Sequence, residues 1–181
     1  MEKAIYIIRH CEAIGQGREA SLTENGFRQA KILSEWLVNK RISRIISSPY
    51  LRAVQTIAPF SENNNIEIET DNRLIERILS TQDFPDWLEK LETTFSDFSL
   101  TYEGGESSEE ATARIVELIN EISTSDHESI AVVAHGGIIA LLLHYYDKNF
   151  GFEQWKNMCN PDVFLLRLSE NIPSCERIWE E

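Results

Sequence analysis

The sequence has few cysteines and no long apolar runs. Cys11, Cys159 and Cys175 are an odd number without CxxC spacing, which argues against a disulfide framework and against a cysteine-based metal site. No apolar stretch approaches the roughly 20 residues of a membrane span, and Arg9 and His10 break the N-terminal apolar run before it reaches the length of a signal core. We therefore expect a cytoplasmic protein with reduced thiols and no membrane partner.

Basic residues are also scarce, since Lys and Arg number 17 against 30 Asp and Glu, for a net charge of −13. A surface this acidic argues against nucleic acid as a partner. It is compatible with a small anionic substrate, because a local cluster of arginines can attract an anion inside an acidic shell. The 181 residues are 42% hydrophobic and 26% charged, which is typical of one globular domain, predicted to span residues 1–181.

Short β-branched runs alternate with segments of helical periodicity. The predicted strands are residues 4–9, 44–48, 66–70, 130–134 and 163–168. This alternation is typical of an α/β fold, a three-layer α/β/α sandwich with a mostly parallel sheet. A last apolar run at 176–179 follows turn residues at 171–174, so we expect a hairpin that makes one edge of the sheet antiparallel.

Helical spacing of apolar residues predicts helices over 23–39, 51–58, 84–98, 111–122 and 138–146. In the first of these, Thr23 is the expected N-cap and Phe27 lies on the predicted apolar face. The second is expected to end near Pro59, because proline interrupts the hydrogen bonds of a helix.

The starts of two later helices carry capping signals. Asp83 and Pro85 are the expected N-cap and first-turn residues of the helix over 84–98. Ser107 and Glu110 have the spacing of a capping box before the helix over 111–122.

Cationic side chains follow three of the predicted strands. Strand 4–9 ends at Arg9 and His10, strand 130–134 is followed by His135 and Gly136, and Arg52 stands just after strand 44–48. In a doubly wound sheet, ligands bind beyond the carboxyl ends of the parallel strands. Cationic groups gathered at one edge repel one another unless an anion lies between them. The sequence therefore predicts an anion site at this edge.

Phosphate is the anion that these residues favour. The planar guanidinium of arginine matches phosphate oxygens bidentately, and the amides of Gly136 and Gly137 at a helix N-terminus would add donors. A neutral histidine can attack phosphorus directly, and neighbouring arginines disfavour its protonation. By contrast, we interpret His127 and His144 as structural, because neither stands at a strand end beside an arginine.

Other phosphate chemistries do not fit the spacing. A cysteine phosphatase needs five residues between its Cys and Arg, whereas six separate Cys11 from Arg18. A P-loop and a metal-binding cluster are both lacking in the sequence. A phosphohistidine reaction without metal or cofactor then needs a protonated carboxyl group for the leaving oxygen. Glu76 in "RLIER" is the best candidate on pattern, although composition alone does not select it among 30 acidic residues.

Six segments in this order, "IIRHCEA", "SLTENGFRQA", "SSPYLRAVQTI", "RLIE", "GGES" and "VAHGG", resemble the histidine phosphatase superfamily, the phosphoglycerate mutase-like group, from about residue 5 to about residue 143. The resemblance implies that His10 is the nucleophile that becomes phosphorylated. It implies that Arg9, Arg52 and His135 complete the phosphate pocket, and that Glu76 is the general acid.

The same resemblance places Gly136 where its amide can reach the substrate, and Gln16 where many members have an asparagine that contacts the phosphoryl group. The segment after Glu76 lacks the Tyr-Gly and paired-arginine elements of the mutases. The resemblance therefore implies a phosphoric monoester hydrolase that acts on a small phosphorylated metabolite or a phosphoprotein.

Two alternatives stay open from the sequence: a mutase-type phosphotransferase, and a non-catalytic phosphate- or phosphopeptide-binding module. The second rests on Cys11, which stands in place of the usual glycine and would be strained if the backbone there needed a positive φ. Cys11 could also make the site sensitive to oxidation. The leaving-group pocket is predicted near Phe84, Trp87 and Tyr102.

Overall fold

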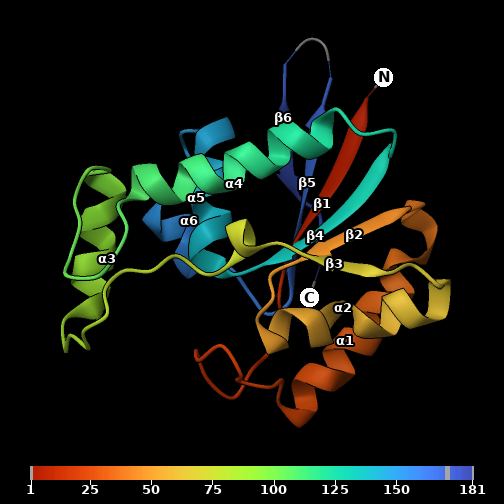
Figure 1. Cartoon of the computed structure of the whole chain (residues 1–181), viewed down its shortest axis with the longest axis horizontal. Coiled ribbons are helices and arrows are strands. Elements are labelled where there is room, and N and C mark those ends of the chain that lie inside the picture. Colours follow the sequence, from red (N-terminus) through yellow and green to blue (C-terminus); the bar gives the residue numbers. More distant parts are fainter. Residues whose placement is uncertain (1, 170–171, 181) are drawn as a thin grey trace.

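The β-strands form one mixed sheet that contains every predicted strand. The computed structural model describes residues 2–169 and 172–180, and six strands in these ranges pair in the order β3-β2-β4-β1-β5-β6 (Figure 1). The strands are β1 Lys3–Arg9, β2 Arg44–Ser47, β3 Ile68–Thr70, β4 Ser129–Ala134, β5 Asp162–Leu168 and β6 Ser174–Arg177. The last strand begins two residues before the predicted run.

The antiparallel part of the sheet is wider than predicted. Strands β1 to β4 are mutually parallel, whereas β5 runs antiparallel to β1 and β6 runs antiparallel to β5. The predicted hairpin is confirmed, but it adds two strands with antiparallel neighbours instead of one edge strand. Asn171 of the predicted turn lies outside the described residues.

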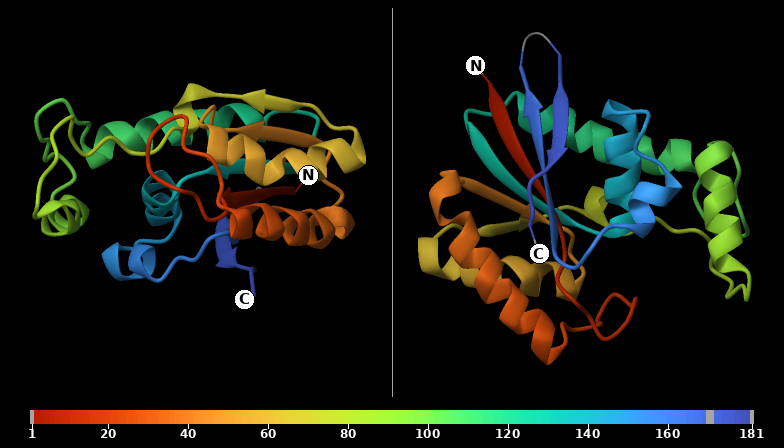
Figure 2. Two further views of the ribbon diagram at one scale, coloured as in Figure 1. Left: turned by 90° about the horizontal axis from the view of Figure 1, so that it is seen from below. Right: turned by 180° about the vertical axis from the view of Figure 1, so that it is seen from behind.

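Helices cover both faces of this sheet, as the alternation of side chains along β1 requires. Ile5 and Ile7 point into a core shared with α4 and α5, while Tyr6 and Ile8 point into a second core shared with α1 and α2. The three-layer α/β/α arrangement is therefore confirmed (Figures 1 and 2). The helices are α1 Glu24–Leu37, α2 Leu51–Asn64, α3 Trp87–Ser96, α4 Ser108–Ser123, α5 Gly136–Tyr146 and α6 Phe152–Lys156, with 3₁₀ turns η1 Val38–Lys40 and η2 Asn72–Leu74.

The centre of the molecule is the most apolar part. Every residue of β4 is buried, because this strand lies between β2 and β1 and is covered on both faces. Helix α5 follows it directly and is buried from Gly136 to Leu143, as expected for a helix that is apolar around its circumference. None of the helices in the described ranges has the length and apolar composition needed to cross a membrane.

Two helix predictions were wrong in detail. Helix α2 continues past Pro59 to Asn64, because Ile57 and Phe60 on either side of the proline are buried in the core. Burial of this face outweighs the hydrogen bond that proline cannot make. In α1 the predicted N-cap Thr23 is confirmed, but Phe27 is 43% exposed instead of facing the core.

Helix α3 begins later than predicted. It starts at Trp87, and Asp83 and Pro85 lie before it. The backbone N–H of Trp87 donates to the carbonyl of Phe84, which closes a turn around Pro85 before the helix starts. The three views agree that α3 projects away from the sheet, beyond the N-terminal end of α4 (Figures 1 and 2).

The predicted capping box of α4 is confirmed and gives a stability test. Ser107 Oγ accepts from the Glu110 N–H at 3.0 Å, and Glu110 Oε2 accepts from the Ser107 N–H at 2.8 Å. We expect Ser107→Ala to lower the free energy of unfolding by about 1 kcal/mol in urea denaturation. Ser123→Ala, at the opposite end of the same helix, is the control, and equal losses in the two variants would contradict a role for the cap.

Candidate active site

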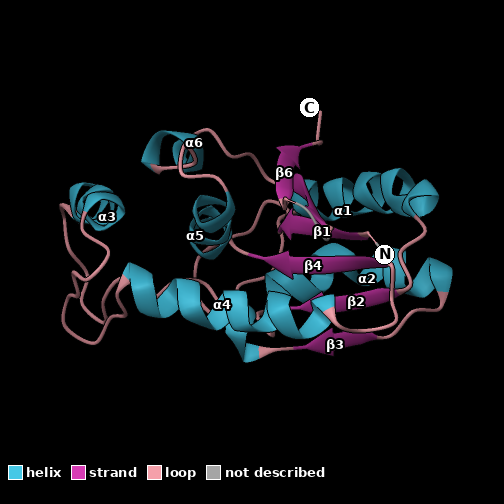
Figure 3. Cartoon of the chain, turned by 90° about the horizontal axis from the view of Figure 1, so that it is seen from above, coloured by secondary structure: helices cyan, strands magenta, loops and turns pink. Residues whose placement is uncertain are grey.

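The carboxyl ends of β1, β2 and β4 point toward the same side of the molecule (Figure 3). In the parallel register of β1 on β4, Arg9 lies beside Ala134. The backbone N–H of His10 donates to the carbonyl of Ala134 at 3.1 Å, and that of Ser48 donates to Val133 at 2.8 Å. The residues that follow the three strands are therefore brought together, as the sequence predicted.

The ring of His10 is held by both nitrogens. Nδ1 lies 2.7 Å from the carbonyl oxygen of Cys11, and Nε2 accepts from Arg52 Nε at 3.2 Å. Because a carbonyl only accepts, the ring proton is on Nδ1 and the lone pair is on Nε2. Burial lowers the pKa of His10 to about 4; the hydrogen bond to Cys11 opposes this shift, and the charges of Arg52 and Arg9 add to it. At neutral pH His10 is a neutral imidazole.

His135 is fully buried next to His10, with ring centroids 5.2 Å apart. Its Nε2 lies 2.8 Å from Ser48 Oγ, which itself accepts from the Tyr50 N–H at 3.3 Å. With Nε2 held by Ser48, the other ring nitrogen, Nδ1, has no hydrogen-bond partner. Burial, followed by the charges of His10 and Arg52, holds the pKa of His135 well below its usual range.

Three buried nitrogens in this cluster have no hydrogen-bond partner: Arg9 Nε, Arg52 Nη2 and His135 Nδ1. The other ends of the two guanidinium groups are fixed. Arg9 Nη1 donates to the carbonyl of Met158 at 3.1 Å, and Arg52 Nη1 donates to that of Gly17 at 2.7 Å. A buried donor without an acceptor costs about 1–3 kcal/mol, so an anion that accepts from all three would relieve this cost.

The carboxylate of Glu76 occupies the N-terminus of α5. Its Oε1 accepts from the N–H groups of Ile138 at 2.9 Å and Arg77 at 2.7 Å, and its Oε2 accepts from Gly137 at 3.1 Å. The helix N-terminus is thus an anion site, as predicted. However, the Gly137 amide holds this carboxylate, so the expectation that both glycine amides face the phosphate was wrong for Gly137.

Both glycines at the start of α5 are required by close packing. A Cβ atom at Gly137 would lie 2.7 Å from Glu76 Oε1, and one at Gly136 would lie 3.0 Å from Arg9 Nε. Any side chain there would displace the carboxylate or the guanidinium. The pair therefore allows Glu76 and Arg9 to approach the same helix end.

Two residues without a predicted role hold the loop that carries Glu76. Arg114 Nη1 donates to the carbonyls of Arg73 at 2.7 Å and Ile75 at 3.0 Å. Its Nη2 pairs with Glu106 at 2.6 Å, and Glu106 Oε1 accepts from the Ile78 N–H at 3.0 Å. Glu106 belongs to the "GGES" segment, which was the only sequence signal for this support.

Arg77 connects the same loop to α3 and α4. Its side chain is buried, and Nη1 donates to Thr94 Oγ1 at 2.9 Å and to Ser108 Oγ at 3.1 Å. Nη2 donates to the carbonyl of Glu106 at 3.2 Å. The position of α3 is therefore tied directly to the residue that follows Glu76.

An open cavity of about 630 Å³ leads to this cluster. The rings of Tyr50 and His135 are 5.0 Å apart, and the Arg52 guanidinium lies 5.1 Å from the Tyr50 ring, so the buried cluster lies directly beneath the cavity. Gln16 lines it from the exposed loop between β1 and α1. The lining residues are Arg9, Gln16, Tyr50, Glu76, Arg77, Ile78, Leu79, Trp87, Leu91, Gly137 and Trp155.

Of the three residues predicted near the leaving-group pocket, only Trp87 lines the cavity. Phe84 and Tyr102 do not line the cavity. Their rings pack against each other at 5.8 Å, with the ammonium group of Lys90 over both. They stabilise the α3 region from outside the cavity.

Cys11 causes no strain. The non-glycine residues with positive φ in the described ranges are Arg41 and Asn65, so the backbone at Cys11 is ordinary. Its side chain is fully buried with Leu22 and Ala30. Burial raises the pKa of the Cys11 thiol to about 12. Both concerns raised by the sequence, strain and sensitivity to oxidation, were therefore wrong, because the thiol is protonated and inaccessible.

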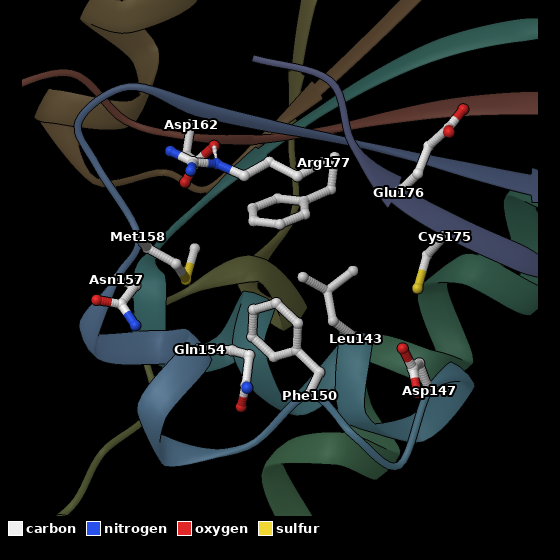
Figure 4. Close-up of a pocket in the computed structure, with 11 residues that line it drawn as sticks. Leu143, Asp147, Phe150, Gln154, Asn157, Met158, Asp162, Cys175, Glu176 and Arg177 are labelled. Carbon is white, nitrogen blue, oxygen red and sulfur yellow. Dashed lines mark hydrogen bonds and ion pairs between the residues drawn. The ribbon is translucent and has the colours of Figure 1, made fainter. Parts of the chain in front are cut away.

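A second cavity of about 310 Å³ lies behind the segment that accepts from Arg9 (Figure 4). Asp162 and Arg177 line it and pair at 2.8 Å. Asp162 also accepts from the Cys159 N–H at 3.1 Å. This bracing fixes the carbonyl of Met158 and through it the Arg9 guanidinium. None of the predicted site residues lines this cavity.

The sequence also matches the model of a known protein family. The family model of the histidine phosphatase superfamily (branch 1) matches residues 5–179. The protein belongs to the histidine phosphatase superfamily. The resemblance of the ordered motifs is confirmed, and the match extends well beyond residue 143 to the last strand. In the described ranges, no group of three or more His, Cys, Asp or Glu residues is placed to hold a metal ion.

Several phosphatases of this superfamily are similar to the chain. Phosphoserine phosphatase 1 of Hydrogenobacter thermophilus is 24% identical over 153 residues, 72% of this chain and 70% of that protein. Fructose-2,6-bisphosphatase TIGAR of Xenopus tropicalis is 38% identical over 86 residues, 41% of this chain and 31% of that protein. A mycobacterial glucosyl-3-phosphoglycerate phosphatase shares the fold, with a TM-score of 0.81, 22% identity and 98% coverage of both chains. Its complex with inorganic phosphate has a TM-score of 0.78 and 23% identity, and covers 98% of this chain and 96% of that one.

The protonation of His10 gives a direct test of the site. Its pKa of about 4 predicts that the ring stays neutral as pH falls from 7 to 5, which an NMR titration of the imidazole nitrogens would detect. Arg52→Gln should raise the midpoint, because it removes a positive charge next to Nε2. A wild-type midpoint near the ordinary value of about 6.5 would contradict the geometry. Since the unfolded chain protonates His10 near pH 6.5, this residue costs stability as pH falls from about 6.5 to 4.

Proposed function

We propose that the protein is a metal-independent phosphatase that hydrolyses phosphomonoesters through a phosphohistidine intermediate on His10. One observation carries the proposal: the lone pair of a neutral His10 Nε2, which accepts a 3.2 Å hydrogen bond from Arg52 Nε, lies in one cluster with three buried, unpartnered nitrogens. Phosphoryl transfer needs a nucleophile in line with the leaving oxygen and positive groups around the equatorial oxygens. His10 supplies the nucleophile, Arg9 and Arg52 supply the positive charge, and His135 adds the unpartnered Nδ1.

In the first step, His10 Nε2 forms a bond to phosphorus as the bond to the ester oxygen breaks. The carboxyl group of Glu76 enters this step protonated and gives its proton to the leaving oxygen. The resulting phosphorylated imidazole carries a positive charge, which the Cys11 carbonyl stabilises through the Nδ1–H at 2.7 Å. The guanidinium groups of Arg9 and Arg52 stabilise the charge on the equatorial oxygens.

In the second step, the Glu76 carboxylate takes a proton from a water molecule, and the water oxygen attacks phosphorus. The phosphorus–nitrogen bond breaks, and inorganic phosphate leaves. Three amides hold the Glu76 carboxylate at the wall of the cavity that Arg9 also lines, where both proton transfers would occur. One residue thus serves as acid and then as base.

The cavity wall supports hydrolysis over transfer to a phosphoglycerate. Beyond the cluster, the cation in the wall is Arg77, and both of its terminal nitrogens are used by Thr94, Ser108 and Glu106. A mutase substrate with a carboxylate and a second phosphate would need more cations than this. The alternative of a binding module is disfavoured, because its sequence argument, a disabling Cys11, does not hold in this structure.

Hydrolysis of p-nitrophenyl phosphate in the presence of EDTA tests the reaction. We expect His10→Ala to lose turnover by about 10³-fold or more, because the nucleophile is removed. His127→Ala is the matched control, since His127 lies outside the cluster and contacts Ser43. Retained activity in His10→Ala, or a requirement for added metal, would refute the proposal.

Glu76→Gln separates the two steps. For an alkyl phosphomonoester, the loss of the proton donor should lower turnover by about 10²–10⁴-fold. For p-nitrophenyl phosphate, whose leaving group departs without a proton, the first step should persist and the second should slow. Phosphohistidine should then accumulate in Glu76→Gln and be visible by ³¹P NMR at high pH. Its absence, together with equal losses on both substrates, would contradict the role of Glu76.

A further inference from the structure

Most of the 630 Å³ cavity lies outside the phosphate cluster. A phosphoryl group occupies only a small part of such a volume, and cavities of this size enclose molecules as large as drugs. The shape of the remaining space is set by the loop after Glu76, by α3 and by α6. These three elements therefore determine which leaving group fits.

The walls that these elements provide are apolar. Directly after Arg77 come Ile78 and Leu79, and α6 contributes Trp155. From α3, Trp87 and Leu91 stand four residues apart, so they lie on the same side of the helix. Five large apolar side chains thus line one space.

Two of these side chains are exposed to solvent over more than a third of their surface. Trp87 is 51% exposed and Ile78 is 39% exposed, although both line the cavity. Large apolar side chains that share an exposed concave surface are typical of a binding site. Their exposed area is removed from water when an apolar group enters the cavity, which favours binding.

The polar groups in the same wall are few and mostly occupied. Arg77 retains only Nε without a partner, and Gln16 offers one amide. A leaving group that carries a carboxylate or a second phosphate would therefore find few hydrogen-bond donors in this wall.

We propose that the substrate is a phosphomonoester with a large apolar leaving group containing an aromatic ring, and that Trp87 and Trp155 determine this specificity. The inference rests on the proposed phosphatase function. Trp87 is well placed for this role, because its helix α3 is bonded to the residue that follows Glu76. Arg77 Nη1 donates to Thr94 Oγ1 on α3. The helix that carries Trp87 is therefore fixed relative to Glu76.

Two primary alkyl phosphates with leaving groups of similar basicity test the specificity. We expect kcat/KM for 2-(2-naphthyl)ethyl phosphate to exceed that for glycerol 3-phosphate by at least about tenfold, because only the former buries a ring against the wall. Trp87→Ala should lower kcat/KM for the naphthyl ester about tenfold, mainly by raising KM. The same variant should lower kcat/KM for glycerol 3-phosphate much less, because this ester places no ring against the wall.

Leu88→Ala is the matched control, since Leu88 is 41% exposed on the same helix and does not line the cavity. Trp155→Leu should shift the ratio of the two substrates in the same direction as Trp87→Ala. Equal hydrolysis of both esters by the wild type, or an equal loss of both in Trp87→Ala, would overturn the inference. If wild-type protein hydrolysed neither ester nor p-nitrophenyl phosphate, the proposed function itself would fail.

Discussion

The parallel pairing of β1 with β4 is the constraint on which the site depends. It sets Arg9 opposite Ala134, so that the chain leaves both strands at the same level and places His10 next to His135. A shift of one residue would turn the apolar side chains of β1 to the wrong faces, because side chains alternate along a strand. The two cores that hold Ile5 and Ile8 therefore also fix the geometry of the histidines.

The cluster at this edge lowers the stability of the folded protein. Arg52 is completely buried, and nitrogens of both site arginines lack partners. The surrounding chain holds them rigidly through backbone carbonyls, which accept without contributing a negative charge that would compete with an anion. A buried cationic cluster of this kind thus leaves the protein less stable than an apolar core would, as is common at functional sites.

The strands and the edge residues could be predicted because they depend on local signals. Apolar β-branched runs define the strands, and the rule for parallel sheets brings together Arg9, Arg52 and His135. The supports of Glu76 could not be predicted, because Arg114 and Glu106 act through side-chain contacts with residues far away in the sequence. The sequence pattern also assigned too large a structural effect to several single residues.

Those single residues show which physical effects a sequence pattern does not contain. Pro59 was expected to stop a helix, but the burial of Phe60 outweighed one missing hydrogen bond. Phe84 and Tyr102 have the composition of a binding pocket, yet their rings pack edge to face against each other outside the cavity, because periodicity does not encode three-dimensional position. Cys11 raised a concern about strain that only the backbone angle could resolve.

The ion pair of Asp162 and Arg177 makes the geometry of the site depend on a part of the chain that is synthesised late. Every candidate site residue precedes Asp162 in the chain, but the buried carboxylate that braces the segment behind Arg9 is neutralised by Arg177 on β6. Before β6 is paired, this carboxylate would be a buried charge without its partner, which is strongly unfavourable. A nascent chain that already contains His10 would therefore still lack a firmly held Arg9 until the last strand had been made.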